Sequence, residues 1–293
     1  MKIISRDRLI CAMGQAAEPA VRIRPGDTIV VETEDCFGHQ VVDAAYSLDE
    51  PLKYDYVNPA TGPIFVEGAR AGDVLKVYIE EISLDPAGGV ASACKGWGAL
   101  GDRVVGSNVR TVEIQGDTAV MEGLRIPLNP MIGVIGVAPA SGSVPNSTPG
   151  PHGGNLDTIE ITQGATVYLP VFVDGAYLAL GDLHAAMGDG EVCGAGGEIR
   201  GSVRMRVDIA RGRTWDHPVV ENDDAFYFLG SAPDYDAAIK IAVAAAVKFI
   251  SEENHVSWED AYMLASLRCD LRFSQIVNPW KTVKMRVPKR LRS

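Results

Sequence analysis

Short apolar segments with the character of β-strands fill most of the first 230 residues, and turn-forming residues separate them. Glycine, proline, aspartate and asparagine punctuate the segments, because these residues adopt the backbone angles that turns require. Two of the turns, Arg24 to Asp27 and Arg70 to Asp73, share a Gly-Asp pair directly before an apolar run. The main strands predicted in this way are residues 28–33, 74–82, 109–114, 158–161, 166–173 and 202–209.

The pattern becomes helical after Gly230. Asp234 can cap a helix, and the twenty or so residues that follow it are apolar on nearly every face, which is typical of a buried helix. Ser257 and Asp260 resemble a capping box, which predicts a second helix over about residues 258–266.

A strand-like segment at residues 282–287 follows the two helices. We therefore expect a mainly β or α+β fold, in which a β-rich body carries a C-terminal helical pair and a returning strand. The body would comprise residues 1–230 and hold the functional site. Residues 231–293 would pack against it, so that the two parts form one compact unit.

The composition excludes some classes of partner. The chain of 293 residues has a formal net charge of −11 and a pI near 4.9, which disfavours nucleic acid and anionic membrane surfaces. Its five cysteines are scattered without a Cys-x-x-Cys pair, as is usual in a reducing compartment. No apolar run approaches the length of about 18 residues that a membrane helix needs, and no apolar leader opens the chain. We expect a cytoplasmic protein that does not bind membranes.

The densest group of reactive side chains lies between Pro151 and Glu198. Asp182 and His184 are two residues apart at the end of an apolar run, so a strand would project both from the same face. A carboxylate beside an imidazole can chelate a borderline cation such as zinc. Alone, such a pair more often marks a turn aspartate and a buried histidine. The acids and glycines that follow favour a metal site.

Several stretches of the chain resemble one known family. They are PHGGNLD from Pro151, GDLHAAMGDGEVCGAGGE from Gly181, TEDCFG from Thr33, NPATGPIFVEGARAGDVLKV from Asn58 and PMIGVIGVAP from Pro130. In this order along the chain they are similar to the acetamidase/formamidase family of small-amide hydrolases. The resemblance implies a metal-dependent enzyme that releases ammonia from short aliphatic amides. It also implies a scaffold of β-sandwich and barrel-like units with a C-terminal α/β piece. Met187 and the pair Gly196-Gly197 depart from the family's pattern, which leaves the size of the substrate open.

Three further acids are candidate metal ligands. Asp157 would be a third ligand, or the acceptor that orients His184; the alternative is that it simply shapes a turn. Asp35 ends an apolar strand as Asp182 does, and the resemblance at TEDCFG implies that the two strand ends converge on one metal. Glu198 is the third candidate, either as a ligand or as a proton shuttle.

Glu191 and His152 are the candidate catalytic residues. Loss of hydration in the glycine-rich loop would raise the pKa of Glu191 and suit it to proton transfer. His152 would bind the metal or donate a hydrogen bond to the oxyanion of the tetrahedral intermediate. Asp189 is interpreted as a solvated loop acid.

Cys193 offers a rival mechanism. Its thiol could attack the amide directly, with Glu191 as the base. The surrounding segment lacks a lysine to activate the thiolate, so we interpret Cys193 as a small buried apolar side chain.

These residues predict a metal-dependent amidohydrolase of small neutral amides such as formamide or acetamide. A divalent cation, zinc in the first place and calcium as an alternative, would activate water, and Glu191 would pass the proton to ammonia. Two alternatives stay open: a metal hydrolase of a larger or cyclic C–N bond, and a non-catalytic β-rich module that holds calcium. We expect a homo-oligomer, a dimer in the first instance.

Overall fold

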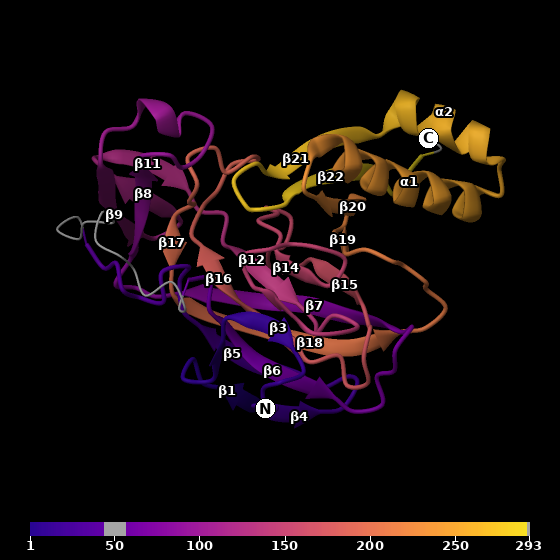
Figure 1. The fold of residues 1–293 in the computed structure, drawn as a ribbon, viewed down its shortest axis with the longest axis horizontal. Coiled ribbons are helices and arrows are strands. Elements are labelled where there is room, and N and C mark those ends of the chain that lie inside the picture. Colours follow the sequence, from indigo (N-terminus) through magenta and orange to yellow (C-terminus); the bar gives the residue numbers. More distant parts are fainter. Residues whose placement is uncertain (44–56, 292–293) are drawn as a thin grey trace.

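The computed structural model describes residues 1–43 and 57–291. Within these residues the chain forms two large β-sheets, a two-stranded ribbon and two α-helices (Figure 1). The predicted mainly β fold with a C-terminal helical pair and a returning strand is therefore confirmed, although neither large sheet closes into a barrel.

The first large sheet, which has nine strands in the described part of the chain, joins the N-terminal and C-terminal regions. The predicted boundary at residue 230 falls inside its strand β20, so the two predicted parts share this sheet. In spatial order its strands are β1 (Lys2–Ile4), β5 (Thr28–Thr33), β18 (Gly201–Ala210), β7 (Val74–Leu84), β15 (Thr166–Pro170), β19 (Val219–Glu221), β20 (Ala225–Ala232), β22 (Lys281–Pro288) and β21 (Asp270–Gln275).

The second large sheet has eleven strands among the described residues and carries the candidate site. Its central strand is β16, which pairs with β12, β17 and β6. The main path runs β11 (Leu124–Pro127), β10 (Thr118–Met121), β9 (Ser107–Gln115), β8 (Gly89–Cys94), β17 (Glu198–Ile199), β16 (Leu178–His184), β12 (Met131–Gly136) and β14 (Gly153–Asn155). The branch strands are β6 (Ala60–Val66), β2 (Leu9–Ile10) and β4 (Val21–Ile23), and the ribbon pairs β3 (Ala12–Gly14) with β13 (Ser143–Pro145). A short 3₁₀ helix, η2, spans Gly101–Arg103.

The main hydrophobic core lies between the two large sheets. Alternate residues of β5, such as Ile29 and Val31, and of β7, such as Val77, are fully buried and belong to the same core cluster as Ile135 of β12 and Leu180 of β16. This alternation is what places one face of a strand against a facing sheet. β16 is buried along its whole length, so side chains at its end are held rigidly and away from bulk water.

The two helices begin where the capping residues predict. They are α1 (Tyr235–Asn254) and α2 (Trp258–Arg268), which lie over one face of β20 and β22 at the C-terminal end of the molecule (Figure 1). The side chain of Asp234 accepts a hydrogen bond from the Ala237 amide, and Ser257 accepts one from the Asp260 amide. Among the described residues, no helix is long and apolar enough to cross a membrane.

Residues 158–161 form a turn, where the sequence predicts a strand. The amide of Ile161 donates to the carbonyl of Thr158, and the Thr158 hydroxyl donates to Ser274 over 2.9 Å. These contacts bend the chain sharply after Asp157 and bind the turn to the C-terminal segment.

Candidate active site

Four buried carboxyl groups and one buried imidazole meet where β16 ends. The Nε2 atom of His184 lies 3.2 Å from Glu198 Oε1, 3.5 Å from Asp182 Oδ1 and 3.9 Å from Asp157 Oδ1. Glu191 is the fifth member, because its carboxyl group shares a hydrogen bond with Asp157. We call these five residues the acid cluster. Asp182 and His184 thus lie together, as their spacing predicts.

Strand pairing and two glycines make room for the acid cluster. Antiparallel pairing of β16 with β17 sets Glu198 directly opposite His184. A Cβ atom on Gly133 of β12 would lie 2.6 Å from a carboxylate oxygen of Asp157 and 2.6 Å from one of Asp182. A Cβ atom on Gly196 would lie 2.5 Å from Nδ1 of His184. Packing therefore explains the glycine at position 196, because no larger residue fits against the imidazole of His184.

Three of the acids have a left-handed backbone. The φ angles are 38° at Asp157, 59° at Asp182 and 49° at Glu191. Such angles are uncommon for residues with a side chain and cost on the order of 1–3 kcal/mol each, so they persist only where the surroundings hold them. Held conformations of this kind cluster at functional sites, which supports a functional role for these carboxyl groups.

Burial and mutual repulsion disfavour negative charge in the acid cluster. Burial, and then the charge of Asp182, raises the pKa of Asp157 to about 6. Burial likewise raises the pKa of Glu198 to about 8 and that of Glu191 well above its usual range. Burial opposes charge on His184 as well, yet the surrounding carboxylates raise its pKa well above its usual range. The acid cluster therefore has too little positive charge to balance its four carboxyl groups.

The acid cluster has the donor atoms of a cation site. Each of its four acids keeps one buried oxygen without a hydrogen-bond partner. Within the described ranges, no lysine or arginine nitrogen lies within 4.0 Å of any of these carboxylates, and His184 is their only basic neighbour. Buried polar atoms are normally paired, so this set of unpaired oxygens fits a divalent cation. Two donor triads are close enough to hold one: Asp157, His184 and Glu191, and Cys36, Asp182 and Glu198.

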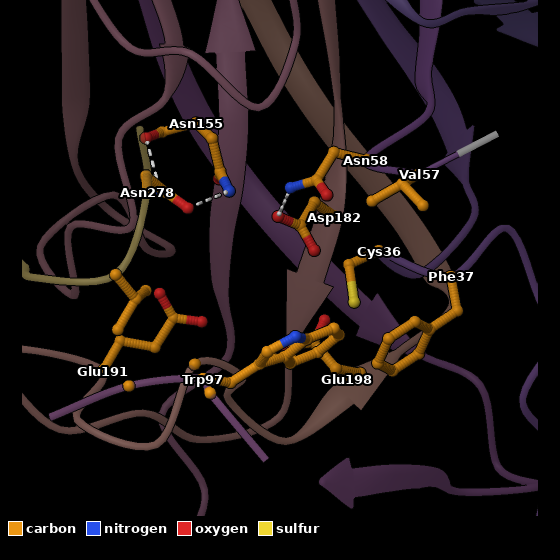
Figure 2. Close-up of a pocket in the computed structure, with 14 residues that line it drawn as sticks. Cys36, Phe37, Val57, Asn58, Trp97, Asn155, Asp182, Glu191, Glu198 and Asn278 are labelled. Carbon is orange, nitrogen blue, oxygen red and sulfur yellow. Dashed lines mark hydrogen bonds between the residues drawn. The ribbon is translucent and has the colours of Figure 1, made fainter. Parts of the chain in front are cut away.

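A cavity of about 250 Å³ opens beside the acid cluster. Glu191 lies on one side of it, and Cys36 and Phe37 lie on the other, with Asp182 and Glu198 also on its walls (Figure 2). Its apolar lining consists of Phe37, Val57, Trp97 and Val277. The cavity thus combines an acidic wall with an apolar one, at a size suited to a small molecule.

Two asparagines that the sequence did not single out hold the acids in place. Nδ2 of Asn278 donates to Oδ2 of Asp157 over 2.7 Å, and Nδ2 of Asn58 donates to Oδ2 of Asp182 over 3.3 Å (Figure 2 shows the second bond). Asn278 also exchanges hydrogen bonds with Asn155, which lines the cavity. Both asparagines come from segments far from the Pro151–Glu198 stretch, so only proximity in the fold discloses them.

Comparison with known proteins identifies the family of this chain. Residues 15–148 and 141–291 match the Acetamidase/Formamidase family. The chain belongs to this family. The acetamidase of Bacillus halodurans has a crystal structure that superposes with a TM-score of 0.94 at 44% sequence identity, covering 98% of this chain and 97% of that one.

More distant curated relatives of this family member are longer proteins. A putative formamidase of Schizosaccharomyces pombe is 26% identical over 253 residues, which cover 66% of this chain and 62% of the relative. The formamidase of Methylophilus methylotrophus is 26% identical over 248 residues, which cover 64% of this chain and 61% of the relative. The chain therefore spans about three fifths of the length of these two relatives.

In this family member the carboxylate of Asp35 does not join the acid cluster. Its Oδ1 atom accepts hydrogen bonds from the amides of Phe37 and His39, both 2.9 Å long, and so closes the turn after β5. The predicted convergence of strand ends does occur, because the amide of Asp182 donates to the carbonyl of Glu34. The side chain that this convergence brings to the cavity is that of Cys36, one residue further on.

His152 also lies outside the acid cluster. It lines a separate cavity of about 340 Å³ together with Trp280 and Phe172. Burial lowers its pKa to about 4, with no contribution from the carboxylates of the cluster. Among the described residues, His152 therefore lines a different cavity from the one beside the acid cluster.

Asp189 and Cys193 occupy positions different from those expected. Asp189 is not simply a solvated loop acid, because it pairs with the buried ammonium of Lys284. Cys193 is exposed, where a buried side chain was expected, and its thiol donates weakly to the carbonyls of Ser92 and Ala195. It does not line the cavity beside the acid cluster.

Proposed function

We propose that this chain hydrolyses small neutral aliphatic amides to a carboxylate and ammonia, with the help of a divalent metal held by the acid cluster. The observation that carries the proposal is the set of unpaired buried carboxylate oxygens around Nε2 of His184, beside a cavity of about 250 Å³. Membership in the acetamidase/formamidase family supports the reaction class.

The donor atoms favour zinc over calcium. Asp182, His184 and Glu198 would hold the ion, with Asp157 beside them and the thiol of Cys36 within reach of the same set. Calcium prefers oxygen ligands alone, whereas an imidazole nitrogen and a thiol suit zinc. When bound, such an ion acidifies a water molecule and polarises the amide carbonyl. The same preference argues against a structural calcium module.

Glu191 would carry the proton between water and the leaving group. Its carboxyl group faces the cavity, it is held by the hydrogen bond to Asp157, and its Oε2 atom has no other partner. A carboxyl group whose pKa is raised by burial can accept a proton at Oε2 and then donate it to the departing amine.

The shape of the cavity supports a short substrate. The apolar lining of Phe37, Val57 and Trp97 would contact the alkyl group, and the side-chain amides of Asn58 and Asn155 offer hydrogen bonds to the substrate amide. The surrounding carboxylates would repel an anionic substrate, so we propose a neutral one. Location in the cytoplasm and assembly into a homo-oligomer, a dimer first, remain part of this proposal.

An amide panel tests the proposed reaction. Purified protein, with and without added zinc, is incubated with formamide, acetamide, propionamide and benzamide, and ammonia is measured. We expect turnover of the first three and poor turnover of benzamide, because Phe37 and Trp97 close the apolar wall. A cyclic amide such as 2-pyrrolidinone, whose ring opening is followed by chromatography, addresses the alternative of a cyclic C–N bond. Turnover of the cyclic amide alone would replace the proposed substrate class.

A pair of cysteine variants separates water from a thiol as the nucleophile. Cys193→Ala should keep turnover within about twofold of the wild type, because Cys193 does not line the cavity beside the acid cluster and exposed substitutions usually change the free energy of unfolding by about 0.5 kcal/mol or less. Cys36 is the thiol that faces the cavity, but burial raises its pKa well above its usual range, which disfavours the thiolate. Cys36→Ser should therefore keep turnover, apart from a small decrease due to the loss of one weak donor. A trapped acyl group on either cysteine in mass spectrometry would overturn the water mechanism.

A further inference from the structure

A fully buried lysine lies in the C-terminal strand β22, outside the acid cluster. Lys284 is 0% exposed, and its Nζ atom contacts Oε2 of Glu160 and Oδ1 of Asp189, each at 2.5 Å. Lysine is almost never fully buried unless its charge is paired, and here two carboxylates share it. The ammonium lies more than 4.0 Å from every carboxylate of the acid cluster, so it has no direct contact there.

The two partners of Lys284 belong to the two loops that supply a pair of cluster residues. Glu160 lies three residues after Asp157, and Asp189 lies two residues before Glu191. Asp157 and Glu191 share a hydrogen bond, and with His184 they form one of the two donor triads. One ammonium thus bridges the two loops whose relative placement sets that hydrogen bond.

Strand β21, which lies beside β22, and the residue that follows it form hydrogen bonds with the same two loops. The carbonyl of Ser274, in β21, accepts the Gly190 amide over 2.9 Å, and the Ser274 hydroxyl accepts from Thr158 over 2.9 Å. The amide of Ile276 donates to the carbonyl of Gly190 over 3.0 Å. Gly190 lies next to Glu191, and Thr158 next to Asp157. The β21–β22 hairpin therefore holds both loops, with Lys284 as its only charged contact to them among the described residues.

We propose that Lys284 is a positioning residue, which sets the distance between Asp157 and Glu191 by pairing with Glu160 and Asp189. This inference rests on the proposed amide hydrolysis. Three of the four apolar residues that line the cavity, Phe37, Val57 and Trp97, belong to other parts of the chain, and one, Val277, lies in the turn of the hairpin. Loss of Lys284 should therefore disturb proton transfer more than it disturbs substrate contacts.

The test compares three variants under saturating zinc with acetamide as substrate. Lys284→Met keeps the aliphatic stem and removes the charge, and we expect kcat to fall by about 10²-fold with KM changed by about twofold or less, because a misplacement near 1 Å costs about that much. Lys284→Arg should restore part of the loss. Arg286→Met is the matched control: Arg286 lies on the same strand but pairs with Asp270 of the hairpin, and its kcat should stay at the wild-type value.

A milder variant keeps the test decisive if Lys284→Met does not fold. Asp189→Asn removes one arm of the bridge at a side chain that is 32% exposed, and kcat should fall by about tenfold, less than for the lysine variant. Wild-type kcat in either folded variant would overturn the proposal, and so would a loss in Arg286→Met as large as that in Lys284→Met.

Amide hydrogen exchange distinguishes failure of this proposal from failure of the proposed function. Residues 157–162 and 188–196 should exchange faster in Lys284→Met than in Arg286→Met, whatever the substrate of the protein is. If the wild type hydrolyses no amide but these two segments still loosen together, the proposed function fails and the bridging role stands. Unchanged exchange in both segments would overturn the bridging role itself.

Discussion

Replacement of His184 by alanine is expected to abolish amide hydrolysis in a protein that still folds. Among the described residues, its Nε2 atom is the only basic nitrogen within 4.0 Å of the carboxylates of Asp157, Asp182 and Glu198. Without it the acids would repel one another and take up protons, and the cation site would lose its nitrogen ligand. Ammonia release measures the loss, and the thermal unfolding midpoint and near-ultraviolet circular dichroism check the fold.

His217→Ala is the matched control for His184→Ala. His217 is partly buried and lines a different cavity, beside α1 and Trp215. Its replacement removes an imidazole without touching the acid cluster, so turnover should stay at the wild-type level. Full turnover in soluble His184→Ala would contradict the assignment of the cluster as the active site.

Glu191→Gln should lower turnover by about 10²–10⁴-fold, equivalent to roughly 3–5 kcal/mol of activation free energy. Glutamine has nearly the same shape and can still bond to Asp157, but it cannot accept and return a proton. Metal content and the unfolding midpoint should therefore stay close to the wild-type values. The measurements are kcat for acetamide and bound metal per chain, made on the same preparation.

Glu198→Gln is the matched control for Glu191→Gln. Oε1 of Glu198 accepts the Gly196 amide over 2.8 Å and lies 3.2 Å from His184, which is the position of a ligand. Its replacement should lower metal occupancy first and turnover as a consequence. If Glu191→Gln loses the metal while Glu198→Gln keeps it and loses turnover, the two roles are reversed. If neither variant loses turnover, the proton travels by another route.

Local sequence patterns predicted the elements that depend on interactions between residues close together in the sequence. Residues 28–33 form β5 as predicted, and the capping signals at Asp234 and Ser257 mark the starts of α1 and α2. The spacing of Asp182 and His184 predicted that both side chains reach a common point. In each case the deciding interaction lies within a few residues of the chain, where a pattern can express it.

The parts of the site that depend on distant segments were not predictable in this way. Asn278 reaches Asp157 across 121 positions, and Asn58 reaches Asp182 across 124. Neither asparagine lies near its partner carboxylate in the sequence, so no local spacing predicts the contact. In the sequence, Lys284 is one of several basic residues between Lys281 and Arg292, and only the fold reveals that it is buried.

Backbone conformation explains why Asp35 and residues 158–161 differed from expectation. Asp35 follows a strand as Asp182 does, but its carboxylate is used by two amides of the next turn, so Cys36 faces the cavity instead. Asp157 has a φ of 38°, which ends any extended segment at that residue. Two side chains spaced i, i+2 share a face only where the backbone is extended, and the backbone at functional sites often departs from that conformation.

Elemental analysis of the purified protein tests most directly whether the acid cluster holds a divalent metal that amide hydrolysis requires. Bound transition metal per chain is measured by mass spectrometry alongside ammonia release, before and after exhaustive chelation and after zinc is restored. We predict stoichiometric metal in the untreated wild type, loss of metal and turnover together on chelation, recovery of both with zinc, and little metal in His184→Ala. Undiminished turnover by chelated protein that contains no metal would contradict the account.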